Sequence, residues 1–143
     1  MMGWLFSTRR DPNDPLQLQI AVHELGHAVV WKAVGFVIKS VVHEGDSGSV
    51  DVRWDPDNLT GYVIGCWGGF EAERRWARLH GRSARRTNSS HDIANFHHVN
   101  RALGARRLSE SKARALARKH VDRHWAQIQR RAPELVRSGR IYL

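Results

Sequence analysis

Residues 20–30 read IAVHELGHAVV, and they contain the pattern H-E-x-x-H at residues 23–27 inside an apolar run. On an α-helix, side chains four residues apart lie on one face, so His23 and His27 can reach the same metal ion. Glu24 follows His23 directly, and its carboxylate can hold and deprotonate a water molecule. The stretch therefore predicts a buried helix with a zinc site and a general base.

The same pattern also arises by chance on long helices, where the two histidines bind no metal ion. The neighbouring residues favour the metal site, because residues 20–30 are otherwise apolar or small. Burial of two histidines and a glutamate without an ion would cost about 1–3 kcal/mol for each unpaired polar group. A bound metal ion removes that cost.

Composition indicates one domain of an ordinary globular kind. The chain has 143 residues, with 41% hydrophobic and 26% charged residues. Its formal net charge of +9 favours an acidic partner, such as nucleic acid, a membrane surface or an acidic protein. The single cysteine, Cys66, excludes a disulfide within the chain and a cysteine-based zinc site.

The sequence contains no apolar run near the roughly 20 residues that a membrane-spanning helix needs. The apolar residues 1–6 are too few for the core of a signal peptide, and their charges follow instead of preceding them. We therefore expect a cytoplasmic protein. We further expect a flexible arm over residues 1–13, a single domain over residues 14–132 and a C-terminal tail over residues 133–143.

The elements around the histidines follow from local signals. Asp14 and Pro15 are typical of a helix start, and Gly35 of a helix end, which predicts a helix to about Val34. Residues 36–43 and 50–54 read as strands of a small hairpin or sheet. Many metallopeptidases bind substrate as an added strand on such an edge.

Three more helical segments complete a mainly α fold. Residues 59–80 are helical in pattern, and glycines 65, 68 and 69 indicate either close approach of another backbone or a break near Gly68. Residues 91–103 form a helix whose buried face begins with Asp92. A last, basic helix is expected from Ser109 to about Ala132, ended by Pro133.

A catalytic zinc ion takes three protein ligands, so the chain must supply a third. The long metzincin motif is excluded, because Val30 and Ala33 stand where it needs glycine and histidine. The residues themselves leave Asp92, Glu71 and Glu73 open as ligands. Asp92 also fits a helix-capping position three residues after a serine. His91, His97 and His98 read as solvated or packing histidines.

Three segments, in order, resemble the peptidase domain of the FtsH-type zinc metalloproteases. They are residues 21–28 (AVHELGHA), residues 68–73 (GGFEAE) and residues 89–93 (SSHDI). The family patterns are Ala-x-His-Glu-x-Gly-His-Ala, Gly-Gly-Arg-x-Ala-Glu and Gly-Ala-x-x-Asp-Leu. The resemblance covers about residues 14–130. It implies a helical zincin-like metallopeptidase fold, with the metal ligands and the general base at His23, His27, Asp92 and Glu24.

The chain also departs from that family. Phe70 replaces the usual arginine, and Asn88 or Ser89 stands where the aspartate segment has glycine. No G-x-x-x-x-G-K-[ST] motif occurs, so we expect no ATPase module. The expected activity is zinc-dependent hydrolysis of peptide bonds in unfolded or flexible segments. The expected partners are a polypeptide substrate, a separate ATPase or adaptor, and further copies of the chain, since the resemblance implies a ring.

Two alternatives remain open from the sequence. The same histidine motif resembles the ImmA/IrrE-type regulatory metallopeptidases, which would take the third ligand from Glu71 or Glu73. A nucleic-acid-binding or inactive module on the same fold is favoured by the net charge of +9 and by the arginine-rich last helix. No helix-turn-helix or zinc-finger signature supports that second alternative.

Overall fold

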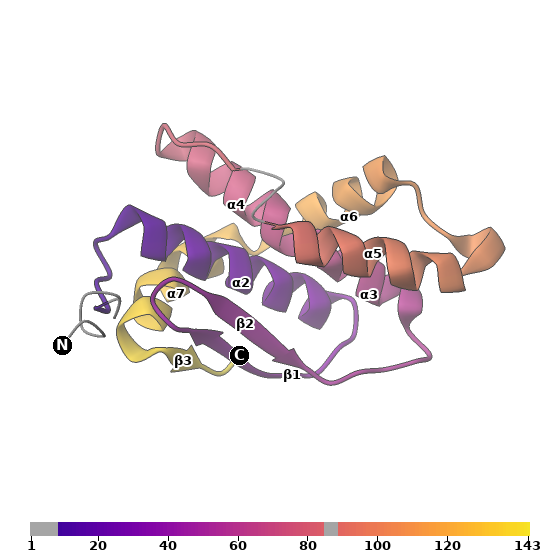
Figure 1. Ribbon diagram of the computed structural model, residues 1–143, viewed down its shortest axis with the longest axis horizontal. Coiled ribbons are helices and arrows are strands. Elements are labelled where there is room, and N and C mark those ends of the chain that lie inside the picture. The colour runs from indigo at the N-terminus through magenta and orange to yellow at the C-terminus, as the bar shows by residue number, and fades with distance from the viewer. Residues whose placement is uncertain (1–8, 85–88) are drawn as a thin grey trace.

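The computed structural model describes residues 9–84 and 89–143 (Figure 1). Helices dominate it, and the three strands form one antiparallel sheet, so the expected mainly α class with a small sheet is confirmed. In chain order the elements are α2 (Pro15–Ala33), β1 (Ile38–His43), β2 (Gly48–Val52), α3 (Leu59–Cys66), α4 (Gly68–Leu79), α5 (Ser90–Ala102), a 3-10 turn (Gly104–Arg106), α6 (Glu110–Arg123), α7 (Trp125–Ser138) and β3 (Arg140–Ile141).

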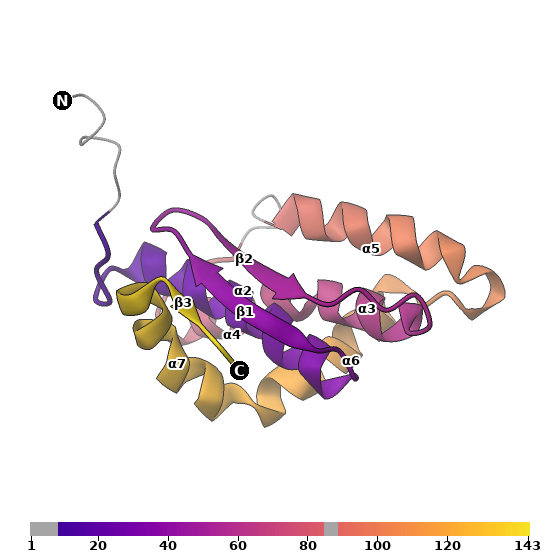
Figure 2. The same cartoon turned by 90° about the horizontal axis from the view of Figure 1, so that it is seen from below.

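The central element is α2, the helix that carries the two histidines. It starts as expected, because the Asp14 side chain accepts a hydrogen bond from the backbone N–H of Leu16 at 2.9 Å and Pro15 occupies the first turn. It ends before Gly35, whose φ of 111° suits glycine. The sheet lies against one side of α2, and α4 packs against another (Figures 1 and 2).

The sheet has the order β2-β1-β3, which leaves β2 at an edge. The β1–β2 hairpin pairs Val41 with Val50, and β3 pairs Ile141 with Val41 from the other side. The hairpin agrees with the expectation from sequence, whereas β3 was not expected. Four residues of this edge strand, Gly48, Ser49, Val50 and Val52, border the pocket described below.

Two expectations about the chain ends need correction. The last helical region is two helices, and Pro133 lies inside α7 instead of ending a helix, so residues 133–141 are part of the fold and not a tail. Burial explains this, because Leu135 and Val136 are both 0% exposed and hold this segment on the core. At the other end, Arg10 donates to the backbone oxygen of His43 at 2.8 Å, while residues 1–8 of the expected arm lie outside the described residues.

The expected helix over residues 59–80 is divided at Trp67 into α3 and α4. Close backbone approach also occurs there, since a Cβ at Gly68 would lie 2.5 Å from the carbonyl oxygen of Gly26. A Cβ at Gly26 would overlap the carbonyl oxygen of Gly68 and come within 2.5 Å of the Ala72 Cβ. The two glycines therefore let α2 and α4 cross in backbone contact, which brings α4 up to the histidines.

Replacing Gly26 by alanine is expected to destabilise the protein by about 1–3 kcal/mol, the usual cost of overpacking a well-packed core. The sign of this change in stability is informative, because replacing glycine by alanine at an exposed helix position stabilises a protein by roughly 0.5–1 kcal/mol. Thermal unfolding followed by circular dichroism measures the effect. An unchanged or higher Tm for Gly26→Ala would show that the two helices do not pack this closely.

Candidate metal centre

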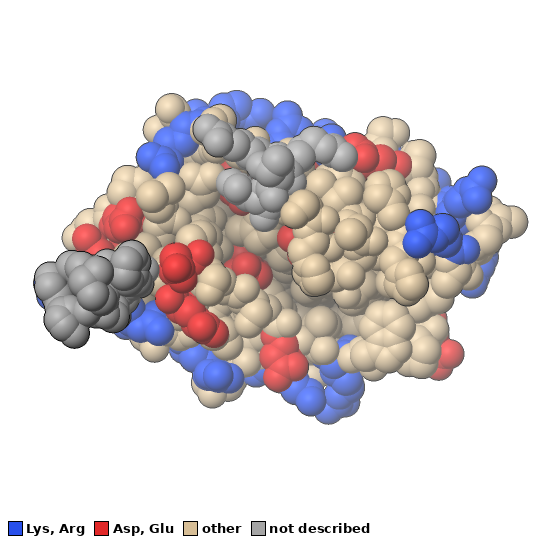
Figure 3. Space-filling model, viewed as in Figure 1, with Lys and Arg blue, Asp and Glu red and all other residues tan. Residues whose placement is uncertain are grey.

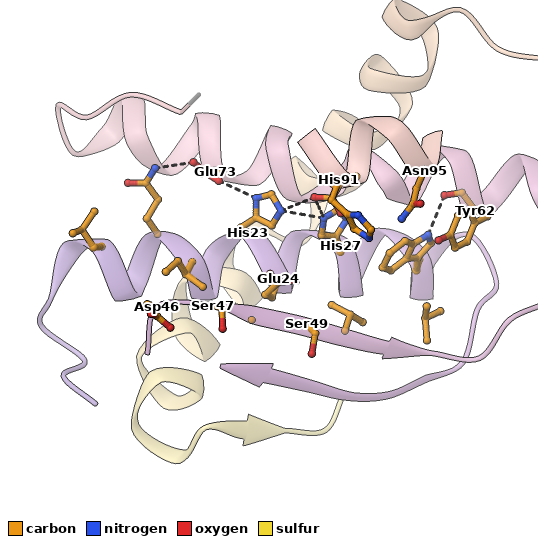
Figure 4. A pocket seen from close by; sticks show the side chains of 18 residues that line it. His23, Glu24, His27, Asp46, Ser47, Ser49, Tyr62, Glu73, His91 and Asn95 are labelled. Carbon is orange, nitrogen blue, oxygen red and sulfur yellow. Dashed lines mark hydrogen bonds and ion pairs between the residues drawn. The ribbon is translucent and has the colours of Figure 1, made fainter. Parts of the chain in front are cut away.

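The donor atoms of three side chains converge on one point: His23 and His27 of α2, which lie close together in Figure 4, and Asp92 of α5. The Nε2 atoms of His23 and His27 are 3.1 Å apart, and each is 3.0 Å from Oδ2 of Asp92. The histidine side chains are 9% and 3% exposed, and that of Asp92 is 24% exposed. The structure thus brings together the three residues that the sequence analysis proposed as metal ligands.

The outer nitrogens of both histidines are hydrogen-bonded. Nδ1 of His23 lies 2.8 Å from Oε1 of Glu73, and Nδ1 of His27 lies 2.8 Å from the backbone oxygen of Gly65. A carbonyl oxygen and a carboxylate both accept, so we assign the proton to Nδ1 in each ring. This leaves both Nε2 lone pairs directed at the shared point, the arrangement that metal-binding histidines use.

The donor set fits a zinc ion. Four ligands arranged tetrahedrally at about 2.0–2.1 Å from zinc lie about 3.3 Å from one another, close to the three separations found here. Two imidazole lone pairs facing each other repel unless a proton or a cation lies between them. Space for an ion is also preserved, because a Cβ at Gly69 would overlap Nε2 of His27 and lie 2.6 Å from Nε2 of His23.

The electrostatics of the metal-free cluster follow from these contacts. Burial lowers the pKa of His23, but hydrogen bonds to Asp92 and Glu73 outweigh it and raise that pKa to about 10. Burial raises the pKa of Asp92, but His27 and His23 together bring it well below its usual range. The cluster therefore holds a proton at neutral pH, in the place where a cation would otherwise lie.

Zinc binding is expected to release about one proton for each ion bound at pH 7, because His23 must lose its proton to become a ligand. Since the His23 pKa is raised to about 10, the apparent zinc affinity should rise with pH up to that value. The rise should be about tenfold for each pH unit from 6 to 9. Calorimetry in two buffers of different ionisation enthalpy counts the proton. Binding heats that do not depend on the buffer would contradict the protonation described here.

Glu24 lies on the β2 side of the histidines, at the wall of a pocket of about 650 Å³ (Figure 4). A Cβ at Gly48 would approach Cγ of Glu24 to 2.7 Å, so the absence of a side chain on β2 makes room for this carboxylate. Burial raises the pKa of Glu24, while His23 and His27 act in the opposite direction. Figure 3 shows the hollow, with acidic side chains in it. Glu24 thus borders the same pocket as His23, His27 and Asp92.

The other two ligand candidates have different partners. Glu73 contacts the outer nitrogen of His23 and accepts a hydrogen bond from Gln19 at 2.7 Å. Glu71 is 3% exposed and pairs with Arg114 at 2.8 Å and Arg118 at 3.1 Å. Two arginines that contribute to the basic character of the chain are therefore paired with a buried carboxylate, although the Arg118 side chain itself is 51% exposed.

Asp92 does not act as the capping residue that its position also allowed. Ser89 is the N-cap of α5 and makes no side-chain capping bond, while the Asp92 carboxylate turns to the histidines. His91 borders the pocket, and His97 and His98 are exposed. Sequence reasoning did not single out three further residues that border the pocket: Trp31, Tyr62 and Asn95. Helical spacing could have indicated Trp31, four residues after His27, and Asn95, three residues after Asp92. Tyr62 comes from α3, and no local pattern marks it.

A comparison with models of known protein families and with curated proteins finds no match for this sequence. In the described part of the chain, no helix has both the length and the hydropathy needed to cross a membrane.

Proposed function

We propose that the protein is a zinc-dependent peptidase, similar to the peptidase domain of the FtsH-type metalloproteases, which hydrolyses unfolded or flexible polypeptide segments. The observation that carries the proposal is the convergence of His23, His27 and Asp92 in a pocket that Glu24 also lines. Such a set supplies the three protein ligands and the general base that zinc peptidases use.

His23, His27 and Asp92 would hold the ion, and Glu73 and the Gly65 carbonyl would orient the two imidazoles. A bound zinc ion supplies Lewis acidity, which lowers the pKa of a water molecule to about 7 and polarises a carbonyl group. Glu24 would accept a proton from that water as it attacks the scissile carbonyl carbon. The same carboxyl group would then give the proton to the leaving amine. Burial, which raises the Glu24 pKa, suits a group that must both take and return a proton.

The edge strand β2 supports a polypeptide substrate in extended form. Gly48, Val50 and Val52 of this strand border the pocket, beside Glu24. A substrate backbone can pair with such an edge as an additional strand, which requires a segment free of its own folded structure. The proposed substrate is therefore an unfolded or flexible segment.

Hydrogen bonding favours this ligand set over that of the ImmA/IrrE-type enzymes. Glu73 is engaged with His23 through its outer nitrogen, and Glu71 is engaged with arginines of α6. Asp92 is the carboxylate that contacts both Nε2 atoms. We extend the proposal to a cytoplasmic protein that receives unfolded substrate directly or from a separate ATPase or adaptor.

Chelation tests the proposal. The full chain, loaded with one equivalent of zinc, is incubated with a reduced and carboxymethylated protein, which stays unfolded. We expect cleavage that a chelator abolishes and that added zinc restores, followed by gel electrophoresis and mass spectrometry. Cleavage that survives chelation, or none by the zinc-loaded chain, would contradict a zinc peptidase.

A further inference from the structure

Beyond His27, the pocket wall is a row of stacked aromatic side chains. The Trp31 ring, one turn along α2, stacks on His27 with centroids 5.0 Å apart and planes 19° apart. The Tyr62 ring of α3 stacks on the Trp31 ring, with centroids 5.4 Å apart and planes 23° apart. The Trp54 ring contacts the Tyr62 ring edge-on, with centroids 5.0 Å apart. The indole N–H of Trp31 also donates to the backbone oxygen of Tyr62 at 3.0 Å. The Tyr62 ring is therefore packed against Trp31 and Trp54 at the pocket wall.

The hydroxyl group of Tyr62 is a polar group that neither the metal site nor the packing described above uses. Tyr62 borders the same pocket as Glu24, His27 and Asp92, and its side chain is half-buried. Its hydroxyl makes no hydrogen bond to any residue in the parts of the chain that the structure describes, 9–84 and 89–143. Figure 4 shows Tyr62 beyond His27, whereas Glu24 lies between α2 and β2. The pocket is thus bordered by a base at one wall and by Tyr62 at another.

The Tyr62 hydroxyl also keeps its proton over the working range of pH. Burial raises the pKa of Tyr62 to about 12, and the nearby Cys66 and the Asp92 carboxylate act in the same direction. A hydroxyl in this state donates a hydrogen bond and cannot act as a base.

We propose that Tyr62 is a further catalytic residue, whose hydroxyl donates a hydrogen bond to the scissile carbonyl oxygen as that oxygen gains negative charge. This inference rests on the proposed peptidase function. Tyr62 keeps its proton throughout, and Glu24 carries out the proton transfer. Donors that are fixed in place before the reaction stabilise such charge most effectively. His91 and Asn95 also border the pocket, but His91 is exposed and Asn95 has no aromatic ring with which to join the stack.

The Tyr62→Phe substitution tests the proposal, because it removes the hydroxyl and keeps the aromatic stack. We expect kcat for cleavage of the carboxymethylated protein to fall roughly 100-fold, with KM and zinc content unchanged. Removal of one hydrogen-bond donor to a developing oxyanion has an effect of about this size in other enzymes. Tyr142→Phe is the matched control, since the only other tyrosine is 67% exposed and should leave kcat as it is. An unchanged kcat, or a change confined to KM, would overturn the proposal.

A binding measurement separates this role from a purely structural one. The probe is a peptide phosphinate with the sequence of a cleaved site, because its anionic oxygen resembles the charged carbonyl oxygen. Tyr62→Phe should weaken phosphinate binding by the same factor as it lowers kcat, and should leave binding of the cleaved product peptide unchanged. Equal weakening of both ligands would overturn the proposal. A zinc-loaded parent chain that cleaves nothing overturns the peptidase function itself, whereas equal cleavage by parent and Tyr62→Phe overturns the role of Tyr62 alone.

Discussion

Replacing Glu24 by glutamine is expected to lower peptide cleavage by about 1,000-fold or more while the protein still binds zinc. General acid–base catalysis contributes typically 10²–10⁴-fold, and glutamine has nearly the same shape as glutamate but cannot accept the proton. Glu24 is not one of the three groups whose donor atoms converge, so the metal site should stay intact. Cleavage rate and zinc content are measured on the same preparation.

Glu44→Gln is the matched control, because Glu44 is an exposed carboxylate between β1 and β2 and does not border the pocket. It should cleave as the parent does. If Glu24→Gln cleaved unfolded protein as fast as the parent, Glu24 would not be the base. If it lost zinc together with activity, the carboxylate would instead be part of the metal site.

Replacing Asp92 by alanine is expected to weaken zinc binding more than 100-fold, whereas Glu73→Ala should weaken it about 10–100-fold. The difference follows from their contacts, since Asp92 lies 3.0 Å from both Nε2 atoms and Glu73 lies 2.8 Å from the outer nitrogen of His23. Loss of an outer hydrogen-bond partner typically costs 10–100-fold in metal affinity, and loss of a ligand costs more. Competition with a chromophoric chelator measures both constants.

Asp57→Ala serves as the control for removal of an acidic side chain, because Asp57 is exposed and distant from the cluster in sequence. It should bind zinc as the parent does. If Glu73→Ala lost more affinity than Asp92→Ala, the ligand set would be that of the ImmA/IrrE-type enzymes. The comparison therefore decides between the two kinds of metallopeptidase.

Local signals predicted the central helix well. Asp14, Pro15 and Gly35 mark the ends of α2 through capping and backbone preferences, which act within a few residues. The histidine pair could also be predicted, because its spacing places both rings on one helix face whatever the rest of the fold.

The predictions from sequence were wrong where burial in the folded protein overrides a local signal. Pro133 predicts a helix end, but burial of Leu135 and Val136 keeps the chain helical to Ser138. The break at Trp67 is not such an error, because the glycines left a break near Gly68 and close backbone approach open as alternatives, and the structure shows both. Such outcomes depend on contacts between segments distant in sequence.

In the site too, some residues could be predicted from local sequence, and others depend on contacts between distant segments. Asp92 was one of three carboxylates that the residues left open, and the structure brings it to both histidines. The position of Glu73 behind His23 depends on the α2–α4 crossing, which no spacing in the sequence gives. Tyr62 reaches the pocket because α3 lies beside α2, and its own neighbours in sequence give no indication of this role.

A zinc titration of the metal-free full chain by calorimetry is a direct test of the proposed metal site. We predict one zinc ion bound for each chain, with binding lost when His23 and His27 are both replaced by alanine. Absence of zinc binding by the folded parent chain, or binding that survives the double replacement, would contradict a zinc site at these residues.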